Sequence, residues 1–238
     1  MQRLTQFASS VIMITLSACG TRHDTGGNQA AMNNLSESNP MAVAQTPAAS
    51  PSDRLLAAAE PFEALTETAF TDPPNKLDQT IALGRKAVTD VRSLLDPATA
   101  TRIDGLLAEV DRDRTSNKRA ELALSSIEIY RSLVSSVPAG TKVPVDVSLL
   151  DYSGFRYQAD LKATPARWND MKQAVSFAQG RWAALSPKIA DKAVSEPFAA
   201  TLSAMDKAVA ARDSKAAETA VTAELDQVDK LEAYFNTL

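Results

Sequence analysis

The sequence predicts an all-α protein, an up-down helical bundle, from three observations. After Arg54 the chain is rich in Ala, Leu, Val, Lys, Glu and Asp and sparse in Gly, which is the composition of helices. Apolar residues recur there in alternating steps of three and four, which favours antiparallel packing. A capping side chain also precedes a proline at four places, as is typical of a first helical turn. These pairs are Asp72-Pro73, Asp96-Pro97, Thr164-Pro165 and Ser186-Pro187.

These signals predict eight helices. In chain order we expect them over residues 54–70, 75–95, 97–112, 116–136, 146–162, 165–184, 187–211 and 214–236. The second helix has small or apolar residues at helical spacing, namely Leu77, Ile81, Gly84, Val88, Val91 and Leu95. The sixth has the same spacing at Trp168, Met171, Val175, Ala178 and Trp182. The segment 137–145, with two prolines and a glycine, interrupts the series at its middle.

The interruption divides the helical domain, residues 53–238, into two halves of about 53–137 and 146–238. We interpret the halves as tandem pseudo-repeated four-helix units, because similar short sequences recur in the same order. Examples are Leu55-Leu56 with Leu149-Leu150, Leu95-Asp96-Pro97 with Leu185-Ser186-Pro187, and Arg112-Asp113 with Arg212-Asp213. The alternative is a chance alignment, because sequences rich in Ala and Leu match easily.

The first 18 residues have the pattern of an export signal. A short apolar run, Val11-Ile12-Met13-Ile14, is followed by small residues directly before Cys19, the only cysteine. The stretch Leu16-Ser17-Ala18-Cys19 resembles the lipobox of bacterial lipoproteins. The resemblance implies that residues 1–18 are a lipoprotein signal peptide and that Cys19 carries acyl chains such as palmitate, which anchor the chain to a membrane. The alternative is an ordinary cleaved signal with an incidental thiol.

We expect residues 19–52 to be the lipidated cysteine followed by a disordered tether. They are polar, and their apolar residues show neither helical nor alternating spacing. Gly20 stands where an Asp would suggest retention in the inner membrane, so by analogy with Gram-negative lipoproteins we expect the outer membrane, facing the periplasm. The net charge of -4 and the lack of a basic stripe argue against nucleic acid. The expected partners are the membrane, through the lipid anchor, and an envelope protein.

Catalytic and metal chemistry is restricted by composition. The chain has one His and one Cys, His23 and Cys19, so the helical domain has neither. This excludes Ser-His-Asp and Cys-His sites, His-ligated haem and ordinary zinc sites in the domain. We expect no enzymatic activity, no cofactor and no metal site. Paired four-helix units resemble the imelysin-like proteins in architecture, but the Gly-x-His-x-x-Glu motif of that family is absent, so its metal site is not implied here.

A candidate cleft lies around two helix-breaking residues, Pro61 and Gly154, at matched places in the two halves. Aromatic and charged side chains gather near them, namely Glu60, Phe62, Glu63, Tyr152, Phe155 and Arg156. If the halves face each other, these residues line a shared cleft. The alternative, which we favour, is that both helices merely bend around the core and that Phe62 and Phe155 pack inside it.

The signal, the tether and the lack of catalytic side chains together favour a membrane-anchored cell-envelope lipoprotein that acts as a helical protein-binding or scaffold module. The alternative function is a periplasmic module that binds a small molecule or a hard cation in a cleft between the two repeats.

Overall fold

The computed structural model describes residues 49–238, and 83% of this part is helical, without strands. The all-α prediction is therefore confirmed. The expected signal peptide, Cys19 and most of the expected tether lie outside the described residues. The described part contains eight α-helices, and the first begins two residues before the expected domain boundary at residue 53.

The first four helices are α1 (Pro51–Thr68), α2 (Pro74–Val91), α3 (Pro97–Thr115) and α4 (Arg119–Ser135). The last four are α5 (Val145–Lys162), α6 (Trp168–Leu185), α7 (Lys192–Ala211) and α8 (Ser214–Thr237). Two short 3₁₀ helices, η1 (Arg92–Leu94) and η2 (Ser186–Lys188), follow α2 and α6. Each expected helix is present, and the ends differ by a few residues.

Helix α3 begins where the sequence predicts, because the expected capping residue, Asp96, does cap it. The Asp96 side chain accepts the backbone N–H groups of Ala98 and Thr99 at 2.9 and 3.0 Å, while Pro97 occupies the first turn. Helix α1 begins earlier than expected because Ser50 and Asp53 form a reciprocal capping box.

Three of the expected start signals are displaced. Pro73, not Asp72, stands at the start of α2, and no side chain caps that helix. The Thr164-Pro165 peptide is cis, and α6 begins three residues later, at Trp168. Ser186-Pro187 forms η2, whereas α7 is capped by Asp191, whose carboxylate accepts the N–H of Ala193 at 2.8 Å. The Asp-Pro and Ser-Pro pattern thus marks a turn more securely than a helix start.

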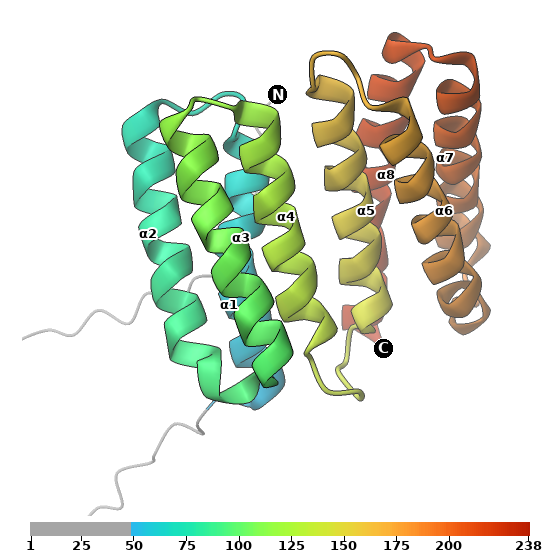
Figure 1. Ribbon diagram of the computed structural model, residues 1–238. Helices are drawn as coiled ribbons and strands as arrows, with labels where there is room; N and C mark the ends of the chain where they lie inside the picture. Colours follow the sequence, from blue (N-terminus) through green and yellow to red (C-terminus); the bar gives the residue numbers. More distant parts are fainter. Residues whose placement is uncertain (1–48) are drawn as a thin grey trace, which may run out of the picture. The chain divides into compact units, whose positions relative to one another are not determined.

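The helices pack as two groups of four (Figure 1). In the first group α1 packs against α2 and α4, and α3 packs against α4; in the second α5 packs against α6 and α8, and α7 packs against α8. The groups meet mainly through α4 and α5, with a smaller contact between α1 and α5. This arrangement agrees with two four-helix units, while their origin by duplication stays a prediction.

The core follows the predicted apolar spacing. In α2 the buried residues are Leu77, Ile81, Gly84, Val88 and Val91. In α6 the inner positions are buried, but Trp168 and Trp182 only pack against the edge of the core. The Trp182 ring lies against Phe198 of α7, with centroids 4.6 Å apart. None of the helices between residues 49 and 238 is both long and apolar enough to cross a membrane.

Candidate functional site

The two phenylalanines of the candidate cleft lie in the core. Phe62 is 1% exposed and Phe155 is 4% exposed. The Phe62 ring lies directly against Gly84 of α2, where an added Cβ would come within 2.8 Å of Cζ. Both rings therefore pack as the favoured interpretation expects, and neither is available to a ligand.

The four polar residues of the candidate cleft are found in three settings. Glu60 lies exposed on α1. Glu63, three residues further along, faces a group of carboxylates from α5 and α8. Tyr152 and Arg156 of α5 instead join a network centred on α4.

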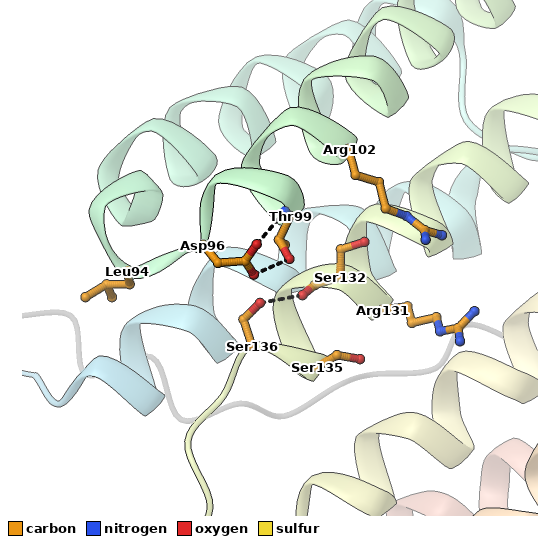
Figure 2. Close-up of a pocket in the computed structure, with 8 residues that line it drawn as sticks. All are labelled: Leu94, Asp96, Thr99, Arg102, Arg131, Ser132, Ser135 and Ser136. Atoms are coloured by element: carbon orange, nitrogen blue, oxygen red, sulfur yellow. Dashed lines mark hydrogen bonds between the residues drawn. The ribbon is translucent and has the colours of Figure 1, made fainter.

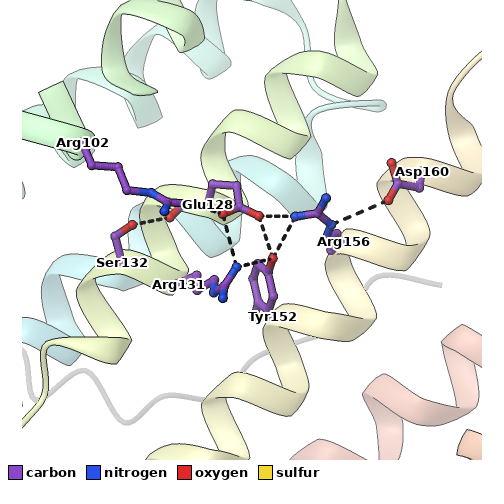
Figure 3. A network of polar contacts seen from close by, with 7 residues as sticks. All are labelled: Arg102, Glu128, Arg131, Ser132, Tyr152, Arg156 and Asp160. Carbon is purple, nitrogen blue, oxygen red and sulfur yellow. Dashed lines mark hydrogen bonds and ion pairs between the residues drawn. The ribbon is translucent and has the colours of Figure 1, made fainter. Parts of the chain in front are cut away.

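Glu128 of α4 is the centre of this network (Figure 3). Its Oε1 accepts a hydrogen bond from the Tyr152 hydroxyl at 2.6 Å and another from Arg156. Its Oε2 accepts Arg102 Nη2 at 2.8 Å and lies 3.7 Å from Arg131 Nη1. Three guanidinium groups from three helices therefore share one carboxylate, which leaves a local excess of positive charge.

Burial controls the proton affinity of the network's other members. Burial and the nearby Glu128 carboxylate raise the pKa of the Tyr152 phenol, so the hydroxyl stays a donor to Glu128. Asp160 is 1% exposed, and burial raises the pKa of its carboxyl to about 7. The ion pair with Arg156, 3.8 Å away, opposes that rise only in part.

A pocket of about 430 Å³ opens beside the network, between the start of α3 and the end of α4 (Figure 2). Its lining is polar except for one leucine, and consists of Leu94, Asp96, Thr99, Arg102, Arg131, Ser132, Ser135 and Ser136. The two arginines lie on the same side of the pocket in this view. Because α3 and α4 are antiparallel neighbours, residues from a helix start and a helix end meet here.

The pocket's arginines are oriented by neighbours but keep donors to spare. The Arg131 guanidinium lies 5.2 Å from the Tyr152 ring centroid and 5.1 Å from that of Phe177, and these cation–π contacts hold its plane. The side chains of Arg102 and Arg131 are 57% and 38% exposed. A guanidinium has five N–H donors, and the contacts with Glu128 and Tyr152 use only some of them.

The pocket's one carboxylate is already engaged. Asp96 caps α3 and also accepts the Thr99 hydroxyl at 2.6 Å. Ser132 and Ser136 donate their hydroxyls to backbone carbonyls of α4, at 2.8 and 2.9 Å, so their oxygens can still accept. Ser135 lies exposed at the rim. The arrangement offers an incoming group mainly cationic donors, which suits an anion.

A second polar feature consists of acidic side chains on α1, α5 and α8, which raise one another's pKa values. We call Glu63, Asp151, Glu224 and Glu232 the acid cluster. Asp151 and Glu224 are 8% and 0% exposed, and Glu63 and Glu232 are half-buried. Burial, with added repulsion from the other acids, raises the pKa of Glu63 to about 8 and raises that of Asp151 as well.

Gly154 makes room for the Glu224 carboxyl. An added Cβ at this position would collide with Oε2 of Glu224 and would come within 2.7 Å of the Leu225 side chain. The sequence suggested that Gly154 thins its helix. In the structure it is the point where the α8 side chains lie directly on the α5 backbone.

Several of these residues were not found from the sequence. Arg102, Glu128 and Arg131 look like ordinary charges on solvated helix faces, because their meeting depends on which helices become neighbours. The serines at the end of α4 gave no signal either, because the same helix also contains Ser125 and Ser126, which are buried in the core.

Comparison of the chain with protein-family models, with curated proteins and with solved structures gives no significant match. Within residues 49–238 no three His, Cys, Asp or Glu side chains are arranged to hold a metal ion. The function is therefore inferred from the geometry of the pocket between α3 and α4.

Proposed function

We propose that this protein is a membrane-anchored cell-envelope lipoprotein and acts as a helical recognition module without catalytic activity. In this proposal the pocket between α3 and α4 receives an anionic group, a carboxylate of an envelope protein partner. The observation that carries the proposal is the pair Arg102 and Arg131, two partly exposed guanidiniums that line one pocket and share the single carboxylate of Glu128.

The distribution of apolar surface supports polar recognition. Among residues 49–238 the large apolar side chains that lie exposed are Leu83, at 62%, and Leu238, at 74%. They belong to α2 and to the chain end, so they form no shared patch. Protein partners usually dock on contiguous apolar surface or on complementary charge. At the pocket between α3 and α4, charge is the feature that the lining offers.

The proposed location rests on the leader sequence. Cys19 with its lipobox supports a lipid anchor, and Gly20 supports the outer membrane facing the periplasm. A tether between the anchor and the helices, which the sequence predicts, would let the pocket meet partners away from the bilayer.

A second candidate is a small anionic molecule as the ligand. The pocket volume of about 430 Å³ falls within the range of about 300–1,000 Å³ that is usual for small-molecule sites. This pocket lies within the first group of four helices, so it differs from the cleft between halves that the sequence suggested.

Photocrosslinking in living cells tests the proposal. A photoreactive benzophenone residue at the pocket rim, in place of Ser135, should form one protein adduct, while the same residue in place of the exposed Leu83 on α2 should not. The adduct should disappear when Arg102→Gln and Arg131→Gln are added. An adduct that survives both changes would refute the proposal that this pocket binds the partner. No protein adduct, together with a co-purified anionic metabolite that both changes release, would establish the second candidate instead.

A further inference from the structure

We propose that the second group of four helices completes the anion pocket, with Tyr152 of α5 and Phe177 of α6 as positioning residues for Arg131. The lining of the pocket comes from the first group of helices. One of its two arginines is nevertheless held by side chains of the second group. This role rests on the proposed function, because it concerns how the same pocket holds an anion.

Arg131 reaches across the junction between the two groups. Figure 3 shows it extending from α4 to Tyr152 on α5, whose ring centroid lies 5.2 Å from the guanidinium carbon. The Phe177 ring on α6 lies 5.1 Å from the same carbon, and Arg131 Nη1 also donates to the Tyr152 hydroxyl at 3.4 Å. Within its own helix, Glu128 Oε2 lies 3.7 Å from Nη1, beyond hydrogen-bond distance. The contacts that orient this guanidinium therefore come from the second group.

The two rings are themselves fixed in place. Tyr152 and Phe177 meet edge to face, with centroids 5.3 Å apart and an interplanar angle of 77°. Tyr152 is buried, and its hydroxyl donates to Glu128 Oε1 at 2.6 Å. Phe177 packs against the core, and its ring also lies 5.1 Å from Arg181, which pairs with Asp146 at 3.5 Å. Packing within the second group thus sets the position of both rings before any ligand binds.

Such an arrangement strengthens binding by ordering the arginine in advance. An arginine side chain has many rotamers, and a ligand that must order it binds more weakly. The face of an aromatic ring attracts a guanidinium, while the N–H donors at the edge of the guanidinium stay available to a ligand. Neither ring belongs to the pocket lining, so Tyr152 and Phe177 act on the anion through Arg131.

Phe177→Leu separates this role from ordinary packing, because leucine keeps an apolar side chain but lacks the aromatic face. The full chain is titrated with succinate and followed through its arginine side-chain signals in nuclear magnetic resonance spectra. The affinity should fall by about two- to fivefold, the factor that corresponds to a cation–π contact at a partly exposed site. Phe177→Tyr keeps the aromatic face and should bind succinate as the unmodified chain does.

A double variant shows whether Phe177 acts through Arg131. Arg131→Gln keeps the other arginine of the pocket and should weaken binding by itself. Adding Phe177→Leu to Arg131→Gln should cause no further loss, because the contact between the two side chains is already gone. A further loss of similar size would mean that the leucine merely disturbs the fold, and would overturn the positioning role.

Phe70→Leu is the matched control, because it removes a cation–π contact of the same kind between the two groups. Lys162 Nζ of α5 lies 4.8 Å from the Phe70 ring centroid. Arg119 at the start of α4 donates to the carbonyl of Ala69, next to Phe70, whereas Arg131 lies roughly 18 Å further along the helix. The control should leave the succinate affinity unchanged. A loss equal to that of Phe177→Leu would overturn the positioning role.

A measurement without ligand or variant tests the contact itself. Rotation about the Nε–Cζ bond, measured by nuclear magnetic resonance, should be slower in Arg131 than in the exposed Arg112. Equally fast rotation in both, or an unchanged succinate affinity in Phe177→Leu, would overturn the positioning role and leave the proposed function intact. Absence of saturable succinate binding to the unmodified chain would overturn both.

Discussion

Two glycines set how closely helices approach in this molecule. Gly84 lies under the Phe62 ring, and Gly154 lies under Glu224 and Leu225. Glycine normally weakens a helix, so its presence inside α2 and α5 needs a compensating contact. At both positions the compensation is a buried side chain that occupies the space of the missing Cβ.

Gly154→Ala should destabilise the protein by about 1–3 kcal/mol, because the added methyl group forces Glu224 and Leu225 out of their places. Urea unfolding followed by circular dichroism measures the change. Gly180→Ala is the matched control, since nothing lies within 4 Å of its added Cβ in α6 and alanine is the better helix former. The control should be neutral or stabilising. Equal effects at both positions would mean that Gly154 has no packing role.

Phe62→Ala should cost about 3–5 kcal/mol of unfolding free energy, the usual effect of removing a buried phenyl group. The same unfolding experiment applies. Leu83→Ala, at an exposed position of α2, should change stability by less than about 0.5 kcal/mol. A near-normal stability of the Phe62 variant would revive the interpretation in which this ring lines a ligand cleft.

At the level of helices, local sequence predicted their existence better than their first residues. Asp96 caps α3 as its pairing with a proline predicts: one carboxylate oxygen accepts the helix N–H groups and the other accepts the Thr99 hydroxyl. Asp72 has the same local pattern, but the helix starts one residue after Pro73, out of reach of the Asp72 side chain. The choice between these outcomes depends on how the preceding turn packs, which a pair of residues does not encode.

Asp96→Ala should therefore lower stability by about 1 kcal/mol, the usual cost of losing an N-cap, while Asp72→Ala should have a much smaller effect. Comparison of the two variants by chemical denaturation checks this difference. A larger effect at Asp72 than at Asp96 would show that the cap assignment is wrong.

At the level of the whole molecule, the fold class was readable because helix composition and apolar spacing are local properties. The candidate site was not readable, because it depends on which helices become neighbours. The sequence grouped Tyr152 and Arg156 with Phe62 only as members of a candidate cleft, whereas the structure joins them to Glu128, 24 and 28 residues away in the chain. Arg102 and Arg131 meet only because α3 and α4 are antiparallel neighbours.

Cys19→Ala should release the protein from membranes or stall its processing. Removing the sulfur removes the site of the first acyl chains, and each buried CH₂ of such a chain contributes about 0.8 kcal/mol to membrane binding. Membrane fractionation with mass analysis of the mature protein is the measurement. A variant that stays fully membrane-bound, with unchanged mass, would contradict the lipoprotein assignment.

The central claim is that Arg102 and Arg131 recognise an anionic group, and a titration of the full chain with succinate tests it most directly. Arginine side-chain N–H signals in nuclear magnetic resonance spectra report each guanidinium separately. We predict saturable shifts confined to Arg102 and Arg131. These shifts should be lost in the Arg102→Gln/Arg131→Gln variant. They should be retained in the Arg112→Gln variant, which changes an exposed arginine on α3, the helix that carries Arg102. Shifts that are spread over all arginines and never saturate would contradict the claim.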